Sequence, residues 1–322
     1  MNLAVADTGL DMSGMTVLTE AATGAYVVTP VLAAMAGAKH VFAFTRPGRH
    51  GTVSDTKRET MELAALLGVA DRIEILEEIS AKILHSVDIV TNSGHLRPLT
   101  TELIDQLRDD AVIALMFEAW EFRPEDLDIG ACARRKIPVV GVNERHPAVD
   151  VFSFLGPLVV KQLHDSGLAV LGNRIGLLCD NDFLPPLRTG LTSLGANVKT
   201  FNSVAAVHPD AWDAFVVALQ PATTLRVGQA EAAHLAACAH AGTVVVQFWG
   251  DIDRTALARN GFAVWPAGPV KQGHMGILLS EIGPEPIVRL QTGGLRAAEW
   301  VRHGGAVTPD GFAQLVPWQA MT

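Results

Sequence analysis

A group of side chains that could do chemistry lies in the segment TNSGHLR, residues 91–97, directly after an apolar run. The segment offers two hydroxyls, an amide, an imidazole and a guanidinium, which belong to Thr91, Ser93, Asn92, His95 and Arg97. Because histidine titrates near neutral pH, His95 could act as a general acid or base. Arg97 could bind a substrate carboxylate through paired hydrogen bonds. The alternative is a turn whose polar side chains satisfy only the local backbone.

Two glutamates, Glu118 and Glu144, directly follow apolar runs that are expected to be buried strands. A carboxylate seldom lies at such a position without a partner, so both are candidate catalytic residues. Glu144 could orient the imidazole of His146, which makes His146 a further candidate. Two alternatives stay open: a metal site that also includes His95 and Asp150, and purely structural ion pairs. Possible ion-pair partners are Arg123, Arg145 and His146.

A turn of small residues, EAATGAY, follows the first apolar run, and Thr23, Gly24 and Ala25 are its candidate cofactor contacts. Small side chains let the backbone approach a ligand, and Thr23 could cap a helix or bind a phosphate. The turn contains one glycine and lacks the GxGxxG pattern of dinucleotide-binding loops. The alternative is a plain tight turn between a strand and a helix.

A basic group, Arg46, Arg49 and His50, follows the second apolar run. Arg46 comes about 20 residues after the first turn, where NAD enzymes carry an acidic residue that binds the ribose. Basic residues at this point suit a 2′-phosphate, so the sequence favours NADP over NAD. Thr91, Asn92 and Ser93 complete the expected cofactor contacts. The alternative is a solvated basic loop.

The second half of the chain supplies candidate substrate contacts after two further apolar runs. These are Asn181, Asp182, Lys271 and His274. Lys271 and His274 would lie at a helix start and could reach into a cleft between two lobes. A packed or capped histidine is the alternative for His274.

The elements that position these residues alternate in the first half between apolar strands and helical segments. Strands that are apolar on both faces belong to a buried parallel sheet, and six of them in alternation with helices predict a dinucleotide-binding domain. The predicted strands are Thr16–Glu20, His40–Thr45, Arg72–Leu76, Asp88–Ser93, Ala111–Phe117 and Pro138–Val142. The predicted helices are Tyr26–Ala36, Asp55–Leu67, Ile79–His85, Thr100–Leu107 and Ile129–Arg135.

The alternation resumes after residue 172 and predicts a smaller flavodoxin-like lobe. Its strands are Arg174–Cys179, Asn197–Phe201, Ala214–Leu219, Thr243–Phe248 and Ala263–Ala267; its helices are Pro185–Leu194, Gly228–Ala239 and Arg254–Arg259. The expected α/β fold therefore has two Rossmann-like lobes with parallel sheets and an inter-lobe cleft. Residues 1–147 form the first lobe, residues 148–172 a linking helix, and residues 173–322 the second lobe with C-terminal helices that pack across the junction.

Composition narrows the function class. A net charge of −9 and a pI near 5.6 disfavour binding to nucleic acid. Three widely spaced cysteines without a CxxC pattern indicate reduced thiols, and no run is long enough to span a membrane. The N-terminus lacks the pattern of a signal peptide, so we expect a cytoplasmic protein. The apolar C-terminal tail and the linking helix make a homodimer a reasonable expectation.

The segment Val87–Met116 resembles the cofactor domain of D-2-hydroxyacid dehydrogenases and adenosylhomocysteinases. The resemblance covers about 30 residues, including Asp88, residues 91–95, Leu103, Leu107 and residues 109–113. It implies a Rossmann domain with a nicotinamide cofactor and carries over no catalytic residue. The pair Thr23-Gly24 is also faintly similar to ornithine cyclodeaminase-like proteins, which implies a reaction without net redox change.

Three functions follow from these patterns. The first is an NADP- or NAD-dependent oxidoreductase that acts on a small polar metabolite, one that carries a carboxylate. The second is a lyase or cyclase of the same fold that retains its cofactor and uses Glu118, Glu144 and Asp150 for proton transfer. The third is a non-catalytic nucleotide- or metabolite-binding subunit of a biosynthetic complex.

Overall fold

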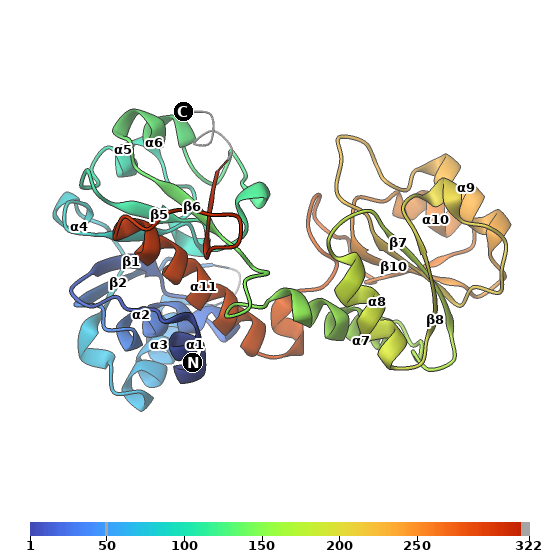
Figure 1. Ribbon diagram of the computed structural model, residues 1–322, viewed down its shortest axis with the longest axis horizontal. Coiled ribbons are helices and arrows are strands. Elements are labelled where there is room, and N and C mark those ends of the chain that lie inside the picture. The colour runs from blue at the N-terminus through green and yellow to red at the C-terminus, as the bar shows by residue number, and fades with distance from the viewer. Residues whose placement is uncertain (49–50, 317–322) are drawn as a thin grey trace. The chain divides into compact units, whose positions relative to one another are not determined.

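The computed structural model describes residues 1–48 and 51–316, and these residues form two compact units (Figure 1). Unit 1 comprises Met1–Val151 together with the chain from Pro284 onward, and unit 2 comprises Phe152–Gly283. Unit 2 is thus an insertion in unit 1. This differs from the expected organisation, in which the C-terminal helices belonged to the second lobe.

Unit 1 is built on six parallel strands in the order β3-β2-β1-β4-β5-β6, which is the order of dinucleotide-binding domains. Each predicted strand of this lobe is present. A seventh strand, β12, was not predicted and pairs antiparallel with β6. The strands are β1 (Thr16–Glu20), β2 (His40–Phe44), β3 (Ile73–Leu76), β4 (Ile89–Thr91), β5 (Val112–Ala114), β6 (Val139–Val142) and β12 (Ala313–Leu315).

Helices cover the sheet of unit 1, and each predicted helix is present, with bounds that shift by at most three residues. They are α2 (Val28–Met35), α3 (Val53–Leu66), α4 (Ala81–Leu84), α5 (Thr101–Ile104) and α6 (Ile129–Arg135); α1 (Asn2–Thr8) was not predicted. Thr52 and Asp55 form a capping box that fixes the start of α3. A 3-10 turn, η1 (Gly24–Val27), joins β1 to α2.

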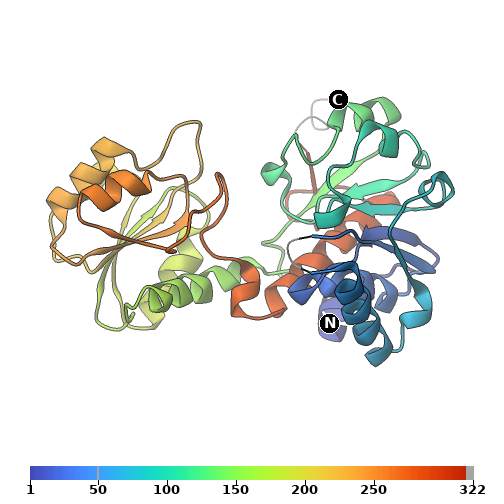
Figure 2. The ribbon, with the colours of Figure 1, turned by 180° about the vertical axis from the view of Figure 1, so that it is seen from behind.

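The long helix α11 (Glu285–Arg302) returns the chain from unit 2 and lies alongside α2 and the strands β5 and β6 (Figure 1 and, from behind, Figure 2). Two glycines allow this close contact. A Cβ atom on Gly293 would lie 2.8 Å from the Val149 side chain, and one on Gly294 would lie 2.7 Å from Met116 Sδ. The tail expected to span the two lobes is therefore a core helix of unit 1.

Asp88, just before β4, ties α11 to the amino end of the sheet. It is 7% exposed, and Oδ1 accepts hydrogen bonds from Arg108 Nη1 at 2.8 Å and Arg302 Nη2 at 3.0 Å. Its Oδ2 accepts from the Thr16 backbone N–H at 2.8 Å. Removal of this carboxylate would leave three donors without their acceptor at a largely buried point.

We therefore expect Asp88→Ala to lower the free energy of unfolding by about 3 kcal/mol. The matched control is Asp109→Ala, which removes a carboxylate that is 95% exposed and pairs with Arg135. That surface pair should contribute less than about 1 kcal/mol. Urea denaturation of both variants measures the difference, and equal losses would show that the Asp88 network has no special weight.

Unit 2 has five parallel strands in the order β8-β7-β9-β10-β11, the flavodoxin-like order that was expected. They are β7 (Arg174–Cys179), β8 (Asn197–Phe201), β9 (Ala214–Ala218), β10 (Val244–Trp249) and β11 (Ala263–Trp265). The predicted helices of this lobe correspond to α8 (Leu184–Ser193), α9 (Gln229–Cys238) and α10 (Arg254–Arg259).

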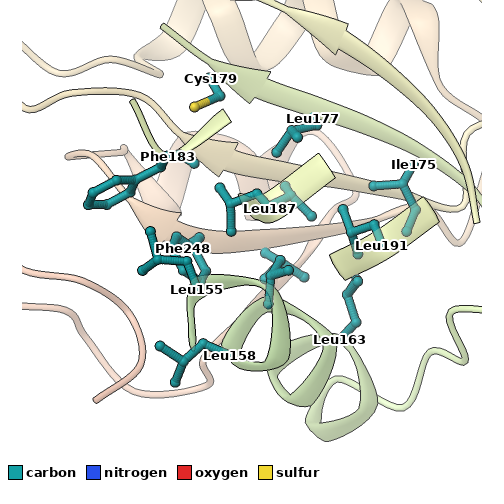
Figure 3. Close-up of a cluster of buried hydrophobic side chains, with 14 of the residues drawn as sticks. Leu155, Leu158, Leu163, Ile175, Leu177, Cys179, Phe183, Leu187, Leu191 and Phe248 are labelled. Atoms are coloured by element: carbon teal, nitrogen blue, oxygen red, sulfur yellow. The ribbon is translucent and has the colours of Figure 1, made fainter. Parts of the chain in front are cut away.

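The predicted linking helix is α7 (Leu155–Asp165), and it belongs to the core of unit 2. Its leucines face those of α8 and the apolar residues of β7 and β10, as Figure 3 shows. The labelled residues of this cluster are Leu155, Leu158, Leu163, Ile175, Leu177, Cys179, Phe183, Leu187, Leu191 and Phe248. Gly156 of α7 and Gly190 of α8 face each other where the two helices meet.

Within the described ranges, no helix is both long and apolar enough to cross a membrane. The three cysteines Cys132, Cys179 and Cys238 are buried free thiols.

Candidate active site

The loops that follow β1 and β4 are joined at the carboxyl edge of the unit 1 sheet. Glu20, the last residue of β1, is 5% exposed and accepts a hydrogen bond from the His95 backbone N–H at 3.0 Å. Burial raises the pKa of Glu20. A Cβ atom on Gly94 would lie 2.0 Å from Glu20 Oε2, so a larger residue at this position would require the carboxylate to move.

Hydroxyl groups also link β1 to the loop that follows β4. Thr91 Oγ1 lies 2.8 Å from Thr19 Oγ1 and 2.7 Å from Ser93 Oγ. Two of the predicted cofactor contacts thus bond to each other and to β1. The third, Asn92, is fully buried, and its backbone oxygen is the acceptor for Arg97.

Arg97 holds the β4 loop in place. Its Nε and Nη2 donate to the Asn92 backbone oxygen at 3.0 and 2.7 Å, and its Nη1 lies 3.6 Å from Asp126 Oδ2. The guanidinium also lies 5.2 Å from the centre of the Phe117 ring, a cation–π geometry. Burial lowers the pKa of Arg97. Most of its donors are therefore engaged within the protein, which differs from the predicted carboxylate-binding role.

Arg46 lies against the same loop. Its backbone N–H donates to His95 Nδ1 at 2.9 Å, and its Nη2 donates to the Arg97 backbone oxygen at 2.9 Å. The predicted cofactor arginine and the predicted catalytic histidine therefore belong to one cluster. The other basic candidates, Arg49 and His50, lie outside the described residues.

A second cluster, the carboxylate centre, consists of Glu118, Glu121 and Glu144 on the loops after β5 and β6. Glu118 is 1% exposed and fully partnered. It accepts hydrogen bonds from the Trp120 indole, from Gln314 Nε2 at 3.3 Å and from the Glu144 backbone N–H at 3.3 Å. An ion pair joins its Oε1 to Arg145 Nε at 3.7 Å. Through these contacts Glu118 ties the loops after β5 and β6 to the segment around β12.

Glu121 and Glu144 differ from Glu118 because no hydrogen bond to another side chain holds them among the described residues. Both carboxylates face the backbone N–H of Glu118. Burial raises the pKa of Glu121 to about 7, and the Glu118 charge adds to the effect. Burial, Glu121 and Glu118 together raise the pKa of Glu144, which is 9% exposed. Each of these neighbouring carboxylates disfavours ionisation of the other.

Glu121 was not predicted, although its spacing from Glu118 contains the signal. The 3-10 turn η4 (Ala119–Glu121) begins after Glu118, and such a turn brings residues i and i+3 to the same side. Tyr26 was missed as well. It lies on η1, and its phenol has Glu20, Arg97 and Glu144 as its charged neighbours, so it stands between the two clusters. Burial raises the pKa of Tyr26, and it is the chain's single tyrosine.

The predicted pairing of Glu144 with His146 is not formed. The His146 ring stacks on Phe312 at 3.8 Å between ring centres, and its Nδ1 accepts from the Ala148 backbone N–H at 3.2 Å. Burial lowers the pKa of His146. Asp150 was suggested as a ligand of a metal site. Its Oδ2 lies 3.8 Å from Nη1 of Arg289 on α11. No three metal-ligating side chains in the described part of the chain are grouped as a metal site.

The turn expected to bind a cofactor diphosphate, Thr23 to Ala25, is already occupied by a carboxylate. Gly24 has φ +65°, as a tight turn requires, but its N–H donates to Glu59 Oε2 of α3 at 3.0 Å. A diphosphate binds to free N–H groups at such a turn and is repelled by negative charge. The residues present therefore do not form a cradle for a dinucleotide unless Glu59 moves away.

The four predicted substrate contacts of the second half all lie in unit 2. The Asn181 amide is bonded within its own unit, to the Ala218 backbone oxygen at 2.7 Å. Asp182 is exposed and follows it. Lys271 and His274 share a turn in which the His274 N–H donates to the Lys271 oxygen at 3.0 Å.

The two units define a class: an α/β protein with the double Rossmann-like architecture of nicotinamide-dependent dehydrogenases. Among solved structures, a dipicolinate synthase component from Bacillus halodurans matches with a TM-score of 0.54 and 12% identity, over 91% of this chain and 98% of that chain. The corresponding dipicolinate synthase component from Bacillus subtilis matches with a TM-score of 0.54 and 11% identity, over 92% and 97%.

A structure described as the pyruvate reductase of Chlamydomonas reinhardtii has a TM-score of 0.51 and 12% identity, over 92% of this chain and 98% of that chain. The expected resemblance to D-2-hydroxyacid dehydrogenase-like proteins is therefore confirmed at the level of the fold. No protein-family model matches the sequence, and no curated protein does.

Proposed function

We propose that the protein is an enzyme that binds a small polar metabolite at the carboxylate centre of unit 1 and exchanges a proton with it. The supporting observation is the pair Glu121 and Glu144, neighbouring carboxylates on the loops after β5 and β6, of which Glu144 is buried and Glu121 is half-buried with its pKa raised to about 7. A general acid or base works best when its pKa lies near the operating pH. The reaction class is that of a lyase, cyclase or isomerase.

The three glutamates have different roles in this proposal. Glu118 is held by Arg145 and three hydrogen-bond donors, and its charge discourages ionisation of both neighbours. Burial and the neighbouring carboxylates raise the pKa of both Glu121 and Glu144, so each favours its protonated form more than an ordinary glutamate does. The protonated member donates to the metabolite, and the ionised member accepts a proton from it. Such positioned proton transfer contributes roughly 10²–10⁴-fold to a rate.

A second candidate is the NADP- or NAD-dependent oxidoreductase acting on a small carboxylate-bearing metabolite. The fold shared with a protein described as a pyruvate reductase favours it, as does the position of Arg46 after β2. The cofactor would supply a hydride to or from the metabolite. This candidate requires Glu59 to leave the Gly24 N–H, so Glu59→Gln should strengthen NADPH binding if it is correct.

The proposal is tested by incubating the protein with amino, hydroxy and keto acids in D₂O and measuring deuterium incorporation by NMR. The wild-type protein should catalyse exchange into one metabolite class, and Glu144→Gln or Glu121→Gln should slow it by about 100-fold or more. The matched control is Glu62→Gln, an exposed glutamate of α3.

The outcomes separate the two candidates. Exchange that survives in Glu144→Gln, or the absence of exchange with all three classes, contradicts the proton-transfer proposal. Turnover that occurs only with NADPH and changes the absorbance at 340 nm would establish the second candidate instead.

A further inference from the structure

Unit 2 has the topology of a nucleotide-binding domain, so its carboxyl edge is where a nucleotide would be sought. In a sheet of this order, ligands bind at the switch point, here between β7 and β9. The segments at that point are residues 180–183 after β7 and residues 219–221 after β9. A diphosphate there needs free N–H groups at the start of the following helix, small residues and no negative charge.

The start of α8 has no N–H available for a phosphate. The Phe183 N–H donates to Asn181 Oδ1 at 3.0 Å, and the Leu184 N–H donates to the Asn181 backbone oxygen at 3.1 Å. The next two residues, Pro185 and Pro186, have no N–H group. The Leu187 N–H enters the helix by donating to the Phe183 oxygen at 3.1 Å. Every donor of the first turn is used or absent.

An ion pair joins the two segments of the switch point. Asp180 accepts from the Gln220 backbone N–H at 2.8 Å and pairs with Arg226 Nη2 at 2.7 Å. Arg226 Nη1 donates to the Gln220 oxygen at 2.6 Å, and Asn181 Nδ2 donates to the Ala218 oxygen at 2.7 Å. The positive charge of Arg226 is thus neutralised by Asp180 and directed to the protein backbone.

The size and the charge of the side chains at this switch point also disfavour a bound diphosphate. The segment after β7 reads Asp-Asn-Asp-Phe over residues 180–183 and contains no glycine. Asp180 and Asp182 bring two carboxylates to the place where a diphosphate would bring two further negative charges. At a separation of about 4 Å in a partly buried site, each like-charge contact is strongly unfavourable.

We infer that the switch point of unit 2 is a structural joint between the β7 and β9 loops and does not bind a nucleotide diphosphate. The fold of unit 2 is retained without the phosphate-binding function of that fold. This inference concerns unit 2 alone and does not depend on the proton-transfer proposal.

The first test titrates the full-length protein with NADPH, NADH and FMN up to 1 mM and follows backbone amide exchange by mass spectrometry. Peptides that cover residues 179–187 and 219–226 should show no added protection with any of the three. Protection of these peptides on nucleotide binding would overturn the inference. Binding with protection confined to residues around 20–26 supports it and would separately favour the oxidoreductase candidate.

The second test distinguishes a joint from a vestigial binding site. Asp180→Ala removes the acceptor of Arg226 and of the Gln220 N–H and should lower Tm by about 5 °C. The matched control, Asp182→Ala, alters the neighbouring exposed carboxylate and should leave Tm within about 1 °C of the wild type. An unchanged Tm in Asp180→Ala would overturn the assignment of a structural joint.

Discussion

Replacement of Gly190 by alanine is expected to destabilise unit 2, although alanine is the better helix former. A Cβ atom on Gly190 of α8 would lie 2.4 Å from Gly156 Cα of α7 and 2.8 Å from the Gly156 carbonyl carbon. These atoms are backbone and cannot rotate away, so the two helices must separate. The separation opens the leucine cluster between them, which Figure 3 shows.

The two effects have opposite signs, and their sizes decide the outcome. Helix propensity favours alanine by about 1 kcal/mol. Overpacking at a close contact costs roughly 1–3 kcal/mol or more, and here the obstacle is backbone. Because the obstacle is backbone, we expect the upper end of that range and a net loss of about 2 kcal/mol in the free energy of unfolding, measured by urea denaturation of the purified protein.

A neighbouring position provides the control for Gly190→Ala. Thr189 lies on the exposed side of α8, so Thr189→Ala changes helix propensity without changing the contact with α7. That variant should be equal to or slightly more stable than the wild type. If Gly190→Ala were as stable as Thr189→Ala, the two helices would not be as close as the glycine contact indicates.

The stability of unit 1 is expected to fall as the pH rises from about 5 to 8, because of the carboxylate centre. The pKa of Glu121 is about 7 in the folded protein and 4.5 as its ordinary value. Between these values the folded state binds more protons than the unfolded state, so stability decreases with rising pH. The stabilising protonated form is present below about pH 4.5 and lost through pH 7.

Glu121→Gln keeps the shape of the protonated form and removes the titration. We expect this variant to be more stable than the wild type by roughly 2 kcal/mol at pH 8, and little changed at pH 5. Chemical denaturation at the two pH values provides the measurement. Glu62→Gln, the exposed control, should leave the pH dependence intact. A wild-type slope that persists in Glu121→Gln would show that this carboxyl group is not the one that titrates.

The strands of both units could be predicted because their residues are apolar on both faces. Strands β4 and β5, for example, are buried at every position, and the six-strand alternation fixed the order of elements. The unit boundary could not be predicted in the same way. The apolar face of α11 shows that the helix is buried, but its pattern does not say against which sheet. Gly293 and Gly294 indicate a close neighbour without identifying it.

Single residues of the candidate site could be predicted from the sequence, whereas the partners that they contact could not. Glu118 and Glu144 stand out because carboxylates at the ends of buried strands are unusual. Their partners depend on turn geometry: a 3-10 turn returns Glu121 to the cluster, and strand β12 brings in Gln314 from 196 positions away. The predicted Glu144–His146 pair was wrong because Phe312, from the same distant segment, provides a stacking partner for the imidazole.

The insertion of unit 2 into unit 1 determines the order in which the protein can be completed on the ribosome. Unit 2 is continuous from Phe152 to Gly283, so it can fold once that stretch has emerged. Unit 1 emerges first but lacks α11 and β12, which cover β5 and β6 and supply Gln314 to Glu118. The first unit to be synthesised is therefore the last to be finished, and its apolar sheet face remains uncovered throughout translation of unit 2.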